Sequence, residues 1–170
     1  MKTTPRLLAV DPSLSATGIA LFEGKDLNSV YLIKTNKENK DRFFEIAWRF
    51  TEALEKFKPN TLAIETQYIS VRSSSVIKVI EVKGLLEGLF YSYCLKYSIN
   101  PVVLQIHPNT AKQAVGVKKM YKRKESKIRV KAAVCHIYPQ LEKQTQDVMD
   151  AIAIGIAGLN EVKRLSAEAE

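Results

Sequence analysis

The sequence has few of the residues that form covalent staples or thiolate metal sites. Its 170 residues include two cysteines, two histidines and one tryptophan. Cys94 and Cys135 both lie in apolar stretches and form no C-x-x-C pair. We therefore expect reduced thiols in the core rather than a disulfide, a zinc site or a redox centre.

Long hydrophobic runs are also missing. No apolar stretch is long enough to cross a bilayer, and the N-terminal residues 1–6 lead into a short apolar strand without the pattern of a signal peptide. We expect a cytoplasmic protein. With 46% apolar residues and no repeat, linker or low-complexity tract, residues 1–170 are predicted to form one domain with a substantial core.

Basic residues outnumber acidic residues in this chain. There are 26 lysines and arginines against 18 acidic residues, which gives a net charge of +8. Between Lys112 and Lys131 nine basic residues face a single acid, Glu125. Such a patch by itself is typical of a solvated helix face, but it also favours a polyanionic partner, because lysine and arginine contacts to phosphate release condensed counterions.

Hydrophobic periodicity predicts an α/β domain. Short apolar runs predict strands at 7–10, 18–22, 30–33, 61–64 and 101–106, the first three antiparallel. Apolar residues at steps of three and four predict helices at 41–57, from the serine cluster 73–75 to about 96, at 110–115 with Thr110 as its cap, at 126–138 and at 145–164. This order indicates a mixed five-stranded sheet flanked by helices.

Four carboxylates occupy positions suited to chemistry. Asp11 and Glu65 end two predicted strands, and Asp147 and Asp150 share a face of the first turn of the last helix. Singly, each has an ordinary explanation as a turn residue, an exposed side chain or a helix cap. Together they offer hard oxygen ligands for Mg²⁺ or Mn²⁺, and two such ions about 4 Å apart can clamp a phosphodiester.

Five segments, in order, resemble a known family. They are LAVDPSLSATG at 8–18, IETQY at 64–68, AKQAVG at 111–116, KIRV at 127–130 and DVMDAIA at 147–153. They are similar to the motifs of RuvC-type Holliday junction resolvases, which are crossover junction endodeoxyribonucleases of the ribonuclease-H-like superfamily.

The resemblance implies a homodimer with a ribonuclease-H-like fold that resolves four-way DNA junctions by paired nicks, in the bacterial cytoplasm or in that of a phage host. Asp11, Glu65, Asp147 and Asp150 would hold two Mg²⁺ ions per site, with Mn²⁺ as a substitute. Lys127 would stabilise developing charge at the scissile phosphate. The candidate DNA-binding residues are Tyr68, which would stack on unpaired bases, Arg72, Lys112, Lys118, Lys119, Lys122, Arg123 and Lys124.

One departure from the family leaves the substrate open. A longer and more basic segment, 117–126, stands where the family has a glycine-rich stretch. Broader activity on branched DNA, or on an RNA–DNA hybrid, is therefore an alternative to junction resolution. An actin-like ATPase domain and a non-catalytic DNA-binding module are more remote alternatives, and a branch-migration motor is a further candidate partner.

Overall fold

A mixed sheet forms the centre of the molecule. The computed structural model describes residues 5–35, 39–66, 74–118 and 122–168. Its strands are β1 (Arg6–Asp11), β2 (Ala16–Glu23), β3 (Asp26–Lys34), β4 (Thr61–Glu65) and β5 (Val102–Ile106), arranged in the order β3-β2-β1-β4-β5. The first three strands are antiparallel, whereas β1, β4 and β5 run parallel.

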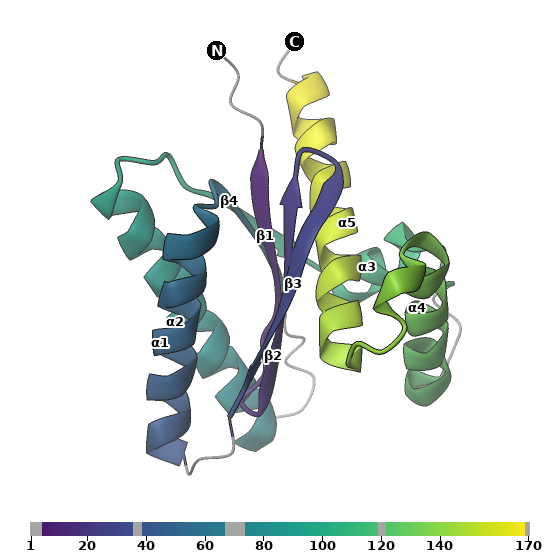
Figure 1. Ribbon diagram of the computed structural model, residues 1–170, viewed down its shortest axis with the longest axis horizontal. Helices are drawn as coiled ribbons and strands as arrows, with labels where there is room; N and C mark the ends of the chain where they lie inside the picture. The colour runs from purple at the N-terminus through teal and green to yellow at the C-terminus, as the bar shows by residue number, and fades with distance from the viewer. Residues whose placement is uncertain (1–4, 36–38, 67–73, 119–121, 169–170) are drawn as a thin grey trace.

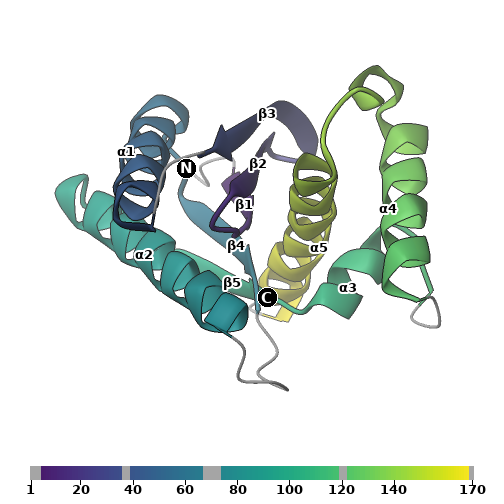
Figure 2. The same ribbon diagram turned by 90° about the horizontal axis from the view of Figure 1, so that it is seen from below.

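Helices cover both faces of this sheet (Figure 1). On one face lie α1 (Asn39–Phe57) and α2 (Ser74–Lys96), and on the other lie α3 (Pro108–Ala114), α4 (Arg123–Ile137), the short 3₁₀ helix η1 (Pro139–Leu141) and α5 (Gln146–Glu168). Figure 2 shows α5 directly against the sheet, with α4 outside it. This three-layer arrangement explains why the central strands are apolar on both faces.

Strand β1 divides its side chains between two cores. Leu7 and Ala9 pack with the layer of α5, while Leu8 and Val10 pack with α1 and α2. Helix α5 lies close to the sheet because it carries glycine where the two meet. A Cβ atom on Gly158 would be 2.8 Å from the Cβ of Ala63. The core therefore fixes the position of α5, and with it the position of the helix start.

The structure confirms the predicted strands and helices and corrects some boundaries. The helix predicted to begin at Thr110 begins at Pro108, because Nδ1 of His107 accepts a hydrogen bond from the backbone N–H of Asn109 at 3.1 Å and acts as the cap. Helix α4 begins at Arg123 rather than at 126, and α5 continues to Glu168. Among the described residues, no helix is long and apolar enough to cross a membrane.

Candidate active site

The parallel pairing of β1 and β4 places two carboxylates at one edge of the sheet. Val10 of β1 pairs with Ile64 of β4. Asp11 and Glu65 are the next residues along each strand, so this register sets them side by side at the carboxyl ends. The sequence prediction that these two acids share an edge is confirmed. This edge is where open α/β sheets place their ligand sites.

The start of α5 brings the other two acids to the same edge. Asp147 and Asp150 lie in its first turns, and the helix contacts both β1 and β2. The approach at this point is close, since a Cβ atom built on Gly18 of β2 would stand 2.0 Å from the backbone oxygen of Asp147. Only a residue without a side chain fits there. Gly18 therefore sets how near Asp147 comes to Asp11, which pairs with Gly18 across the sheet.

All four acids line one cleft of about 410 Å³. The cleft lies between the sheet edge, the start of α5, α3, α4 and α2. Its lining residues are Asp11, Pro12, Ser13, Glu65, Val79, Pro108, Ala111, Lys112, Ser126, Lys127, Val130, Asp147, Asp150 and Ala153. The four sequence-predicted carboxylates and the two predicted lysines nearest to them are thus brought together in one place.

The loop that follows Asp11 is held by a buried threonine. Thr17 has no exposed surface, its hydroxyl donates to the backbone oxygen of Ser13 at 2.8 Å, and it accepts from the N–H of Ser13 at 3.2 Å. This closed turn connects β1 to β2 and leaves little freedom for Pro12 and Ser13. The turn therefore fixes the cleft wall beside Asp11.

Burial and neighbouring negative charges both act on the carboxyl group of Asp11. Removal from water raises the pKa of its carboxyl well above the ordinary value of 3.8, and the charges of Glu65, Asp150 and Asp147 raise it further. Lys127 offsets only part of this effect on the pKa. A carboxylate in such surroundings binds either a proton or a cation.

Asp150 shares this environment to a smaller degree. Burial raises the pKa of its carboxyl, whereas the hydrogen bond from Gln146 and the charge of Lys127 lower it. Nε2 of Gln146 donates to Oδ1 of Asp150 at 2.8 Å. This hydrogen bond holds one carboxylate oxygen and orients the other for a ligand.

The ligand atoms in the cleft are of the kind that Mg²⁺ or Mn²⁺ prefers, but they do not form a closed protein cage around one ion. The cleft supplies carboxylate oxygens and neither a thiolate nor an imidazole. Within the described parts of the chain, no three acids, histidines or cysteines stand close enough together to enclose one ion. The acids instead surround the cleft, as expected when Mg²⁺ takes one or two carboxylates and completes its shell with water and substrate phosphate oxygens.

The lining of the cleft also includes basic residues. Lys112 comes from α3 and Lys127 from α4, and both line the cleft. Ser126 lies beside Lys127 with only 3% of its surface exposed, and its hydroxyl oxygen has no hydrogen-bond partner in the described structure. A cleft that combines acids able to hold a cation with lysines and a hydroxyl group can bind a phosphate group.

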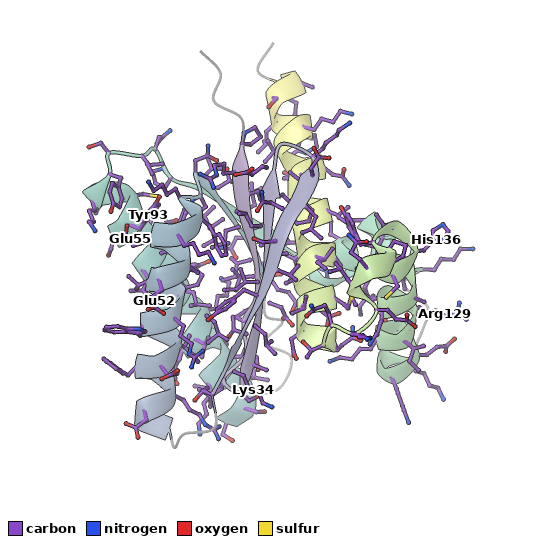
Figure 3. The ribbon with its side chains drawn as sticks, in the orientation of Figure 1. Lys34, Glu52, Glu55, Tyr93, Arg129 and His136 are labelled. Atoms are coloured by element: carbon purple, nitrogen blue, oxygen red, sulfur yellow. The ribbon has the colours of Figure 1, made fainter. Side chains whose placement is uncertain are left out.

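The other predicted DNA-binding residues are more scattered. Lys118, Lys122 and Lys124 are exposed and do not line the cleft. Tyr68, Arg72 and Lys119 lie outside the described residues, as does the side chain of Arg123. Their assignment stays a prediction. Figure 3 shows Arg129 and His136 on the side of α4 that faces away from the sheet, so this helix presents further polar groups to solvent.

Sequence reasoning missed two contributors to the site. Gly18 was part of a quoted motif, but its contact with the backbone of Asp147 depends on how α5 crosses β2, which no local pattern encodes. Ser126 follows four basic or acidic residues and looks like one more solvated position. Its burial arises only because α4 packs this turn toward the sheet edge.

Comparison with known proteins places the chain in a family. A family model described as crossover junction endodeoxyribonuclease RuvC matches residues 7–158. The crossover junction endodeoxyribonuclease RuvC of Synechocystis is 29% identical over 165 residues, which cover 93% of each chain. The protein of the same name from Prochlorococcus marinus is 27% identical over 162 residues, covering 92% of this chain and 97% of that one.

Solved structures agree in fold. Thermus thermophilus RuvC in complex with a Holliday junction substrate has a TM-score of 0.67 at 20% identity, covering 90% of this chain and 91% of that one. The Fowlpox virus resolvase, in complex with Holliday junction DNA, has a TM-score of 0.61 at 16% identity, covering 92% and 98%. These likenesses confirm the predicted ribonuclease-H-like architecture. With the family model matching most of its length, the chain belongs to the RuvC family of crossover junction endodeoxyribonucleases.

Proposed function

We propose that this protein is a metal-dependent endonuclease that resolves four-way DNA junctions by hydrolysing one phosphodiester in each of two strands. The observation that carries the proposal is the cleft in which Asp11, strained by three neighbouring acids, faces Lys112 and Lys127. Acids and lysines that line one cleft suit a divalent cation bound to a phosphate. The family membership favours this activity over an ATPase domain or a non-catalytic module.

The four carboxylates are the proposed metal ligands. We propose two Mg²⁺ ions per site, for which Mn²⁺ substitutes, held by Asp11, Glu65, Asp147 and Asp150. Ions held by these residues would neutralise negative charge on the phosphodiester during hydrolysis. The charges of the three other acids all act on Asp11, so a bound cation relieves their repulsion there.

Two lysine side chains hold the phosphate group at which the DNA is cut. Lys127 acts on the electrostatics of both Asp11 and Asp150, which places its charge near the acids as well as at the cleft wall. It stabilises negative charge that develops on the phosphate oxygens. Lys112 reaches the cleft from α3 and holds the DNA backbone in register with the acids. Preorganised charges of this kind act most strongly where the site excludes water.

Paired cutting needs two such sites, and helix α2 supports a homodimer. Apolar residues lie all round this helix, although one side of it faces solvent. The exposed side repeats at steps of four and three, through Ile77, Glu81, Gly84, Gly88, Tyr91 and Leu95. This is the spacing at which two helices pack along a common seam, and the two glycines leave room for close approach. We propose this seam of α2 as the contact between two copies.

The substrate class is tested with purified protein and end-labelled DNA. A four-way junction, a flap, a linear duplex and an RNA–DNA hybrid are incubated with and without Mg²⁺. The proposal expects symmetric nicks in the junction, dependent on Mg²⁺, and slower or no cutting of the linear duplex. Cutting of the hybrid in preference to the junction would contradict it.

The metal assignment is tested with Asp11→Asn and Asp147→Asn. Both variants keep the lysine wall, so we expect junction binding to persist while cutting falls by orders of magnitude. A melting curve for each variant serves as the folding control. Undiminished cutting by both variants would refute the role of these acids.

A further inference from the structure

A second hollow adjoins the active-site cleft. This groove, of about 700 Å³, lies between α4, η1 and the start of α5, and is lined by Lys124, Lys127, Ile128, Lys131, Ala132, Cys135, Pro139, Glu142 and Gln146. Among the described residues, Lys127 alone lines both hollows. The two hollows therefore adjoin at Lys127.

The floor of the groove is apolar. It is made by Ile128, Ala132 and Cys135 of α4 together with Pro139 of η1. Ile128 is 63% exposed, and together with Ala132 and Pro139 it forms an exposed apolar patch rather than a single exposed side chain. An apolar floor offers nothing to a phosphate, but it offers a contact surface to the flat face of a base.

The rim of the groove is cationic. Lys124, Lys127 and Lys131 follow one another at steps of three and four, which places them along one side of α4. Lys131 is held in place, since its Nζ donates to the backbone oxygen of Gln144 at 3.2 Å. Glu142, on the other side, repels a phosphate that enters the groove but accepts a hydrogen bond from an exocyclic amino group. The charges thus favour phosphates at the rim and an uncharged group inside.

We propose that this groove binds a nucleobase of the strand being cut, from a nucleotide next to the scissile phosphate. The base lies on Ile128, Ala132 and Pro139, while the lysine rim holds its flanking phosphates. This inference rests on the proposed function, because Lys127 links the groove to the site of cutting. Binding of a base in the groove would influence at which nucleotides the strand is cut and how far the strands are opened there.

The proposal is tested by filling the groove. Ala132 is exposed, so Ala132→Phe adds a ring to the groove without entering the core. The matched control is Thr51→Phe, an exposed position in a groove on α1, the helix that carries Glu52 and Glu55 across the sheet from α4 (Figure 3). Both variants are assayed on the four-way junction and on junctions with one abasic nucleotide at each position around the cut.

We expect Ala132→Phe to cut the intact junction about tenfold to a hundredfold more slowly, the range that loss of one stacked base produces. An abasic nucleotide at one position near the cut should restore most of the rate, because nothing then competes with the ring. Thr51→Phe should cut like the wild type on every substrate. Equal cutting of the intact junction by Ala132→Phe and the wild type, or an equal loss on all substrates, would overturn the proposal.

Cys135 provides a readout that does not depend on cutting. It lines the groove and is partly exposed, whereas Cys94 is 1% exposed, so N-ethylmaleimide should modify Cys135 first. We expect bound junction DNA without divalent metal to slow this alkylation, and the matching abasic junction to slow it far less. Unchanged alkylation with DNA bound would overturn the inference, whether or not the wild type cuts junctions.

Discussion

Replacing Gly18 by alanine tests whether the contact between β2 and α5 builds the site. The added Cβ would stand 2.0 Å from the backbone oxygen of Asp147, 2.4 Å from its carbonyl carbon and 3.0 Å from the nitrogen of Val148. All three are backbone atoms at the start of a helix, so no side-chain rotation relieves the clash. Either the helix start or the end of β1 and β2 has to move.

The size of that movement follows from ordinary contact distances. Contacts of a Cβ atom begin near 3.4 Å, so the two backbones must separate by about 1.4 Å. Overpacking of this kind costs about 1 to 3 kcal/mol of unfolding free energy. In a chain of this length that lowers the melting temperature by roughly 2 to 12 °C. A displacement of about 1 Å in a catalytic group lowers the rate by about a hundredfold.

The assay distinguishes a displaced catalytic group from a loss of folding stability. Single-turnover cutting of the four-way junction is measured well below both melting temperatures, over a range of Mg²⁺ concentrations. Gly158→Ala is the matched control, because it also overpacks α5 against the sheet but lies about 16 Å along the helix from Asp147. We expect both variants to lose stability and only Gly18→Ala to lose cutting and to need more Mg²⁺. Equal cutting by both variants would refute the positioning role.

Three further predictions concern charge, burial and assembly. The raised pKa of Asp11 means that its ionised form destabilises the metal-free fold at neutral pH, and that this cost disappears as the pH falls toward 3.8. Asp11→Asn should therefore raise the metal-free melting temperature at pH 7, by about 3 to 5 °C for each pKa unit, with a smaller gain in acid; a lower melting temperature at pH 7 would contradict this. Ser126→Ala should leave the free energy of unfolding unchanged or raise it by up to about 1 kcal/mol, since it removes a buried hydroxyl for which the described residues provide no hydrogen-bond partner. A clear loss in chemical denaturation would show that the hydroxyl is bonded. Gly84→Leu should leave circular dichroism unchanged but weaken the dimer at least about tenfold in sedimentation, because its side chain has open space in one copy and none in a close helix pair; an unchanged dimer would rule out the α2 seam.

Much of the fold followed from the sequence because its signals are local. Apolar runs ending at Asp11 and Glu65 predicted two strands, and the parallel pairing of those strands brought the acids together as expected. The prediction of Thr110 as the cap of α3 was wrong, also for a local reason. His107 satisfies the first turn, and Pro108 starts the helix with a fixed φ, so Thr110 is not needed as a cap.

The features of the site that could not be predicted from the sequence depend on packing between distant segments. The chain shows that residue 18 is glycine, but only the crossing of α5 over β2 shows that a methyl group there would collide with Asp147. In the same way, the basic run around α4 predicts phosphate contacts without showing which lysines turn to the cleft. The structure turns Lys127 toward the acids and leaves Lys122 exposed outside the cleft.

In the proposed mechanism, the four acids bind the divalent metal on which DNA cutting depends. The most direct measurement is a Mn²⁺ titration followed by electron paramagnetic resonance, with the protein bound to an uncleavable four-way junction. We expect two bound ions per subunit in the wild type, and loss of tight binding in Asp11→Asn, while the junction stays bound. Equal Mn²⁺ binding by the wild type and the variant would contradict this mechanism.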